Sequence, residues 1–257
     1  MKPSMSNLTA RAETLSVAER PSFGTAYGAG FPARVVPVPA DRAAAEQDRT
    51  LLLPPSRRVS KRVFDLAASL ALIVLLGPLL VAIALVVRCD GGDALFGHRR
   101  IGAGGRVFRC WKFRSMVLDA DAVLARTLAN DPAARAEWDR DFKLRQDPRV
   151  TPLGKFLRRS SLDELPQLFN VLRGEMSLVG PRPIVAAEVE RYGSAIVEYH
   201  SCKPGITGLW QVSGRNDVDY AERVELDRRY ARTWSLGGDL VILARTLGAV
   251  ARRSGAY

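Results

Sequence analysis

The chain has 257 residues, and its 38 Lys and Arg against 27 Asp and Glu leave a net charge of +11. This length suits one sizeable domain with accessory segments, and this charge favours an anionic partner: nucleic acid, an acidic membrane surface or a phosphorylated substrate. The three cysteines are widely spaced and there are only two histidines, which argues against a disulfide framework, a zinc site or a histidine general base.

The first 55 residues are predicted to be a disordered tail. Residues 21–39 are rich in Gly, Pro and Ala, a composition that favours loop over core. No early apolar run marks a cleaved signal peptide, and we assign the tail no chemistry.

An apolar run follows the tail. Residues 66–87 carry no charged side chain, and about 22 such residues are enough to cross a bilayer as a helix. Gly77 and Pro78 lie near the middle, where proline removes a backbone donor and kinks a helix. Positive residues flank both ends, from Lys61 to Arg88, so charge gives no orientation. The residues leave open a helix-break-helix hairpin in the cytoplasmic leaflet, a kinked spanning helix and a buried core helix.

Short strands and polar helices are predicted beyond the apolar run. Residues 95–102 and 106–114 read as two strands joined by a glycine-rich turn, which could cradle phosphate but lacks P-loop spacing and also fits a plain hairpin turn. Residues 119–145 form a polar helical region broken near Pro132. No strand leads into a GxGxxG motif, so a Rossmann fold is not expected.

Two helices are predicted near the C-terminus. The first is charged and covers about 218–232, and the second opens at Trp234. Apolar residues of the second helix alternate with arginines, which predicts either a helix in an anionic membrane interface or one docked on the core. Asp239 at its start also fits a simple cap.

Asp163 and Glu164 are the centre of the functional prediction. Apolar residues recur after them at helical spacing and Pro166 prefers a first turn, so a helix should begin near the pair and end at Gly174. Both carboxylates would then lie at the positive end of a helix dipole, where a phosphate can also bind. A capping box starting at Ser161 explains the same residues without catalysis and stays open.

Two loops offer groups for an anionic ligand. Arg182 lies between two prolines, and this pre-set backbone suits bidentate recognition of phosphate or carboxylate, although a solvated surface arginine fits too. The glycine-rich loop at 203–216 contains Gln211, Arg215 and Asn216, which could read a nucleotide base, sugar or diphosphate.

From about residue 60 to the C-terminus, the chain resembles the bacterial sugar transferase family, the monotopic phosphoglycosyl transferases. The layout is most similar to short exopolysaccharide galactosyl- and glucosyl-phosphate transferases. The resemblance rests on specific motifs, which are Lys61-Arg62-Val63-Phe64-Asp65, Lys112-Phe113-Arg114-Ser115-Met116, Leu162 to Asn170, Met176 to Pro183, Pro204 to Gly208, Gly214-Arg215-Asn216, and Trp234-Ser235-Leu236 with Asp239.

The resemblance implies the architecture. We expect a mixed α/β fold with a small β region, several helices, an N-terminal re-entrant membrane helix-break-helix and interfacial amphipathic helices. The expected division is a disordered tail at 1–55, a re-entrant hairpin at 56–90 and a cytoplasmic catalytic domain at 91–257, at the bacterial inner membrane. The anchoring residues are expected to be Lys61, Arg62, Asp65 and Pro78. Gly77 replaces the serine common in the family and so lacks a hydroxyl for the carbonyls freed at the break.

The resemblance also implies the reaction, which is transfer of a sugar-1-phosphate from a UDP-sugar to undecaprenyl phosphate at the start of exopolysaccharide synthesis. Asp163 would attack the phosphorus that bears the sugar, giving an aspartyl phospho-sugar that the lipid phosphate then attacks. Mg²⁺ is the expected cofactor, with Glu164 and Asp239 as ligands. The expected substrate contacts are Arg158, Arg182, Gln211, Arg215, Asn216, Lys112 and Arg114.

The expected partners are the UDP-sugar, the polyprenyl phosphate and the cytoplasmic leaflet, with a second copy of the chain left open. Nucleic acid is not expected, because no binding motif or aromatic stacking series is present. A membrane-associated hydrolase of nucleotide sugars and a basic membrane scaffold without catalysis remain alternatives. The sequence does not distinguish galactose from glucose as the transferred sugar.

Overall fold

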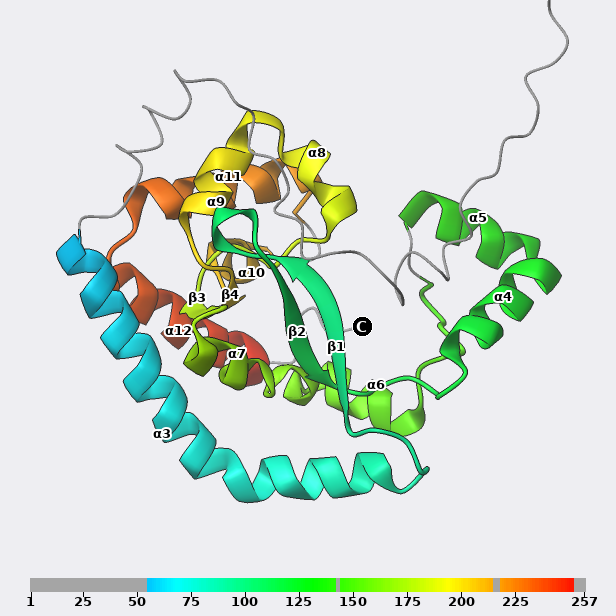
Figure 1. The fold of residues 1–257 in the computed structure, drawn as a ribbon. Coiled ribbons are helices and arrows are strands. Elements are labelled where there is room, and N and C mark those ends of the chain that lie inside the picture. The colour runs from blue at the N-terminus through cyan, green and yellow to red at the C-terminus, as the bar shows by residue number, and fades with distance from the viewer. Residues whose placement is uncertain (1–54, 142–143, 215–217, 252–257) are drawn as a thin grey trace, which may run out of the picture. The chain divides into compact units, whose positions relative to one another are not determined.

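The protein is described by a computed structural model at residues 55–141, 144–214 and 218–251 (Figure 1). The predicted tail, apart from Pro55, lies outside these described residues, and so do Arg215 and Asn216. The described part is rich in helices and contains two small sheets, which confirms a mixed fold with a small β region.

The elements follow one another in a simple order. The α-helices are α3 (Pro55–Arg88), α4 (Ala120–Asn130), α5 (Pro132–Asp141), α6 (Pro152–Arg159), α7 (Gln167–Arg173), α8 (Val189–Tyr192), α9 (Ile196–Ser201), α10 (Leu209–Ser213), α11 (Tyr220–Thr233) and α12 (Leu236–Ala251). The strands are β1 (Leu95–Ile101), β2 (Val107–Phe113), β3 (Ser177–Val179) and β4 (Gly205–Thr207). Short 3-10 turns are η1 (Ala103–Gly105), η2 (Leu162–Glu164), η3 (Ala186–Glu188) and η4 (Gly193–Ala195).

The β1–β2 pair is the predicted hairpin. The strands are antiparallel, and Gly104 and Gly105 in the turn have φ of 63° and 72°, a left-handed conformation that favours glycine. Paired residues of antiparallel strands share a face. One face therefore carries three paired positions, which are Phe96 with Lys112, His98 with Cys110, and Arg100 with Phe108.

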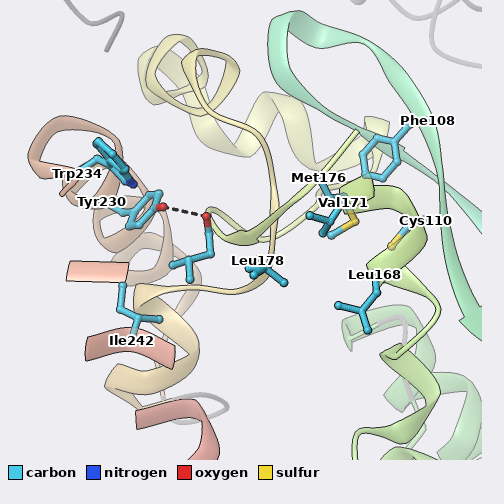
Figure 2. Packing of buried hydrophobic residues seen from close by; sticks show 10 residues of the cluster. Phe108, Cys110, Leu168, Val171, Met176, Leu178, Tyr230, Trp234 and Ile242 are labelled. Carbon is cyan, nitrogen blue, oxygen red and sulfur yellow. Dashed lines mark hydrogen bonds between the residues drawn. The ribbon is translucent and has the colours of Figure 1, made fainter. Parts of the chain in front are cut away.

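The main core lies between this hairpin and the C-terminal helices. Figure 2 shows its buried side chains, which come from β2, α7, β3, α11, α12 and the connections before β3 and α12. Tyr230 donates a hydrogen bond of 2.8 Å from its hydroxyl to the carbonyl of Val179, joining α11 to β3 (Figure 2). β3 and β4 pair in parallel, and this pairing places the loops that follow the two strands at the same end of the small sheet.

Helix α3 contains the apolar run. It bends between two straight arms (Figure 1), and Pro78 lies inside it. Within the described residues, Val59–Arg88 is the one helix long and apolar enough to cross a membrane by length and composition. Leu80, Ile83 and Val87 pack in a cluster with Phe113 of β2, but most of the apolar run is exposed. The interpretation as a buried core helix is therefore wrong.

Helix α12 has two different faces. Ile242 is buried in the main core, with Leu243 packed against the same cluster. Leu240, Val241 and Leu247 on other sides are 51%, 51% and 73% exposed. The helix thus docks on the core and still presents apolar side chains outward, so the two predicted roles are compatible.

Candidate active site

The acidic pair lies in a short turn between two helices. Asp163 and Glu164 occupy η2, and α7 begins only at Gln167, later than predicted, and ends at Gly174 as predicted. Ser161 has a left-handed φ of 58°, and its side chain makes no capping hydrogen bond. The capping-box interpretation is therefore wrong, and the pair needs another explanation.

Lys112 reaches the pair from β2. Its Nζ lies 2.6 Å from Oε1 of Glu164 and 3.9 Å from Oδ2 of Asp163. Burial disfavours the ammonium, but Glu164 and then Asp163 outweigh it and raise the pKa of Lys112 above its usual value. A permanent positive charge therefore stands beside both carboxylates.

Asp163 is the less hydrated carboxylate of the pair. Its side chain is 10% exposed, whereas the side chain of Glu164 is 36% exposed. The pKa of Asp163 is raised to about 6, because the effects of burial and of the Glu164 charge outweigh those of Lys112 and Arg158, which lower it. The result is a poorly solvated carboxylate that is still largely ionised near neutral pH, which suits a nucleophile.

Arg158 approaches Asp163 from the last turn of α6. Thr151 caps this helix by accepting a hydrogen bond of 2.9 Å from the backbone of Gly154. Gly154 lies so close to the backbone of Ser115 that a side chain would not fit there. The Ser115 hydroxyl accepts a hydrogen bond of 2.9 Å from Arg158 Nε, so Ser115 orients the guanidinium. Ser115 is a positioning residue that was not predicted, although it lies in the same motif as Lys112.

Arg114 has a different set of partners from its neighbour Lys112. Its guanidinium donates to Asp90 and, over 2.8 Å each, to the carbonyls of Val87 and Asp93. These bonds tie the end of α3 to the end of β2. The guanidinium donors of Arg114 thus have partners within the protein, and its assignment as a substrate contact stays a prediction.

Asp239 is also occupied by protein groups. It is 1% exposed and accepts hydrogen bonds from Lys61 at 2.6 Å and Trp234 at 3.0 Å. Its Oδ1 lies 2.9 Å from the Tyr230 hydroxyl, whose single proton it shares with the carbonyl of Val179. A metal site shared with Glu164 gains no support from these contacts. In the part of the chain that the structure describes, no three His, Cys, Asp or Glu residues gather as metal ligands.

The other anchoring residues hold the start of α3 on the body. Arg62 donates to the carbonyls of Val171 and Leu172 at 2.6 and 2.8 Å, satisfying groups at the end of α7. Asp65 is 2% exposed and accepts from Ser177 and from the backbone of Leu178. The start of α3 is thus fixed to the same body as its end.

Two of the remaining predicted residues lie near each other on a separate set of elements. The guanidinium of Arg182 lies over the ring of Trp210 at 5.8 Å, and Gln211 follows that tryptophan on α10. The Gln211 amide nitrogen lies 3.5 Å from the carbonyl of Ile206. No described contact joins Arg182 or Gln211 directly to Asp163.

A buried carboxylate between two cations, on a body tied to a long apolar helix, is suited to an enzyme that handles phosphate groups. A sequence profile of the bacterial sugar transferase family matches residues 56–253. The chain therefore belongs to the bacterial sugar transferase family.

Several characterised sequences are similar to this chain. It is 56% identical over 202 residues to the UDP-galactose-lipid carrier transferase of Erwinia amylovora, which covers 79% of this chain and 42% of that protein. It is 55% identical over 202 residues to the undecaprenyl-phosphate galactose phosphotransferase of Salmonella typhimurium, with the same 79% and 42% covered. It is 50% identical over 204 residues to the exopolysaccharide production protein ExoY of Sinorhizobium fredii, covering 79% of this chain and 90% of that protein. The chain spans less than half of the first two relatives and most of the third.

Proposed function

We propose that the chain transfers a sugar-1-phosphate from a UDP-sugar to a polyprenyl phosphate in exopolysaccharide synthesis, through a covalent intermediate on Asp163. The observation that carries the proposal is the buried Asp163 carboxylate, which lies 3.9 Å from Lys112, is within reach of the Arg158 charge and has a pKa of about 6. The names of the relatives, which include undecaprenyl-phosphate galactose phosphotransferase, support the acceptor and the sugar class.

The first step forms a bond between an Asp163 oxygen and the phosphorus that bears the sugar. The bond from this phosphorus to the bridging oxygen breaks, and the nucleoside monophosphate leaves with that electron pair. In the second step an oxygen of the polyprenyl phosphate attacks the same phosphorus, and the Asp163 carboxylate leaves. Two steps let one site serve a soluble donor and a lipid acceptor in turn.

Charge neutralisation is the main demand of phosphoryl transfer, and the site supplies it from two sides. Lys112 stands beside both carboxylates and Arg158 beside Asp163. No base is required, because an ionised carboxylate carries no proton to remove.

The acidic pair could also hold Mg²⁺ together with the donor diphosphate. Glu164 is partly exposed, and only its Oε1 is engaged by Lys112 in the described residues, so its other oxygen can serve as a ligand. Bound Mg²⁺ would neutralise charge on the diphosphate. Asp239 is not included in this proposal, since protein groups contact both of its oxygens.

The re-entrant arrangement of α3 is also part of the proposal. Lys61 and Arg62 fasten its start, and Arg114 fastens its end, to the same body. A helix that spanned the bilayer would place its two ends on opposite sides, about 30 Å apart. The bend at α3 (Figure 1) and the exposed apolar residues of α12 fit a body seated on the cytoplasmic leaflet of the inner membrane.

The test uses purified protein in detergent with UDP-galactose or UDP-glucose, Mg²⁺ and undecaprenyl phosphate, beside an Asp163→Asn variant. We expect wild type to release UMP and to place sugar phosphate on the lipid, and the variant to do neither. UMP release without a labelled lipid would favour the hydrolase. Full activity of the variant would remove Asp163 from the mechanism.

A further inference from the structure

Three arginines from distant parts of the chain lie close together beyond the acidic pair. Arg100 comes from β1, Arg182 from the loop after β3, and Arg223 from α11. Arg182 and Arg223 lie over the ring of Trp210, at 5.8 and 4.6 Å from its centroid. Burial lowers the pKa of Arg100 and of Arg223, and the neighbouring charge of Arg182 lowers both further. Like charges held this close and partly buried are costly without an anion.

The protein supplies few acceptors for these guanidiniums. Arg100 donates to the carbonyl of Pro183 at 3.2 Å, and its nearest carboxylate, Glu188, is 3.9 Å away. Within residues 55–141, 144–214 and 218–251, the Nε of Arg223 is buried without a hydrogen-bond partner. Among the same residues, the Arg182 guanidinium contacts the ring of Trp210 and has no described hydrogen-bond acceptor.

Further unsatisfied polar groups surround the same place. Buried atoms without a partner among the described residues include the indole nitrogen of Trp210 and the hydroxyl of Tyr220. The ring of Tyr220 lies 5.3 Å from the Arg223 guanidinium. Buried polar groups are normally paired, so a group of unpaired ones around three cations points to a missing anionic ligand with polar edges.

Asp227 does not neutralise the three arginines fully. Its carboxylate accepts a hydrogen bond of 2.8 Å from Tyr192. Burial raises the pKa of Asp227 to about 7, although Tyr192 and the backbone of Arg182 lower it by hydrogen bonding and Arg223 and Arg182 lower it by charge. A carboxyl group that is part protonated at neutral pH offsets at most part of three positive charges.

The β1–β2 hairpin connects the two groups of charges, because Arg100 belongs to the arginines and Lys112 to the acidic pair. Arg100 and Lys112 share this face, four strand residues apart, or about 13 Å along the strand. Cys110 lies between them. Burial raises the pKa of the Cys110 thiol to about 11. The charges of Lys112, Arg100 and Arg182 oppose this rise, and the charge of Glu164 adds to it. Arg100 and Lys112 thus extend from the same face of the hairpin, on either side of the buried Cys110.

The two ends of the hairpin suit different substrates, the lipid acceptor at the open end and the soluble donor at the turn. Phe113, at the open end, packs with Leu80, Ile83 and Val87 of the second arm of α3. Arg100 lies near the glycine-rich turn, at the opposite end. A lipid acceptor arriving along this arm of α3 would reach Asp163 first, which leaves the turn end for the soluble donor.

We propose that Arg100 and Arg223 join Arg182 in a subsite for the phosphate of the departing nucleoside monophosphate, with Trp210 as its floor. This inference rests on the proposed function. Guanidinium forks match phosphate oxygens in geometry and charge, and each such bond is stronger than a neutral one.

The test compares Arg223→Gln and Arg100→Gln with Arg229→Gln, an exposed arginine on the same helix as Arg223. We expect KM for the UDP-sugar and the inhibition constant of UMP to rise at least about tenfold in the first two, because each loses a charged hydrogen bond. KM for undecaprenyl phosphate should stay unchanged, and Arg229→Gln should behave as wild type. Arg223→Lys, which keeps the charge, should recover part of the UMP affinity.

Equilibrium binding keeps the test independent of turnover. UMP binding to wild type and to Asp163→Asn is followed by tryptophan fluorescence and calorimetry, beside thermal unfolding of every variant. Loss of UMP binding in a folded Arg223→Gln supports the subsite even if no sugar reaches a lipid, a result that would sink only the proposed function. Unchanged UMP affinity in both glutamine variants overturns the inference, and so does a rise confined to KM for the lipid phosphate. If Arg223→Gln does not fold, Arg100→Gln and Arg223→Lys decide by the same readouts.

Discussion

Lys112 Nζ lies 2.6 Å from Oε1 of Glu164 and 3.9 Å from Oδ2 of Asp163. The lysine therefore hydrogen-bonds one carboxylate of the pair and is only near the other. The closer ion pair holds Lys112 in place. The longer separation lets its charge stabilise Asp163 without blocking the oxygen that would attack phosphorus. The two neighbouring carboxylates therefore have different roles, Glu164 as the partner that positions Lys112 and Asp163 as the proposed nucleophile.

Lys112→Gln should lower turnover about 10- to 100-fold, because it removes a charge-assisted contact at the reacting group. Since Lys112 lowers the pKa of Asp163, its loss should also move the rise of activity to higher pH. Steady-state rates from pH 5 to 9 measure both effects. Lys155→Gln, an exposed position on α6, is the matched control. An unshifted profile would argue that Lys112 acts only through packing.

The pH dependence of the first half-reaction should report Asp163 itself. Burial raises the pKa of this carboxyl to about 6, so the reactive anion forms as pH rises from 5 to 7. UMP release in a single turnover without lipid is the measurement to use, because a phosphate monoester acceptor titrates near the same pH. A midpoint near 4, the ordinary value for aspartate, would contradict the assignment.

Asp163→Asn should make the protein more stable at pH 7.5 while removing activity. The folded-state pKa of Asp163 is raised, so the folded protein binds the proton more tightly and wild type loses stability as pH rises from about 4 to about 6. The gain in the variant is on the order of 1–3 kcal/mol above pH 6 and should vanish below about pH 4. Denaturant unfolding in detergent measures it, with the exposed Asp139→Asn as control. A variant that is less stable than wild type at pH 7.5 would show that the ionised Asp163 carboxylate stabilises the folded protein, contrary to this prediction.

Asp239→Asn tests whether this residue anchors α3 or binds metal. The substitution leaves Lys61 without its buried partner, and breaking such a pair costs about 3 kcal/mol. We therefore expect a lower unfolding temperature and an unchanged Mg²⁺ concentration for half-maximal activity. A double-mutant cycle with Lys61→Met should show strong coupling between the two sites. A large rise in the required Mg²⁺ with unchanged stability would restore the metal assignment.

Cys89 offers a test of membrane topology without an added reporter. Its thiol is exposed just beyond the end of α3, whereas Cys110 is buried and Cys202 half-buried. If both ends of α3 face the cytoplasm, a membrane-impermeant maleimide should label Cys89 in inverted vesicles and not in intact spheroplasts. Cys89→Ser supplies the background. The reverse pattern would mean that α3 spans the membrane.

The local patterns of the sequence determined the elements well. The β1–β2 hairpin, the break at Pro132, the end of α7 at Gly174 and the long apolar helix were all predictable. Each depends on turn chemistry, proline geometry or apolar spacing among close neighbours, which the chain order contains. The importance of Asp163 and Glu164 came from motifs within one short stretch and from the family resemblance that those motifs carry.

Only the tertiary structure decided which side chains remain available for chemistry. Lys61 and Asp239 are 178 residues apart, and Arg114 meets Asp90 across 24, so no local pattern shows that these groups are already paired. The same holds for Arg100, Arg182 and Arg223, which meet because β1, the loop after β3 and α11 pack together. A charged side chain has a few fixed hydrogen-bonding positions, and packing determines whether protein groups occupy them or leave them for a substrate.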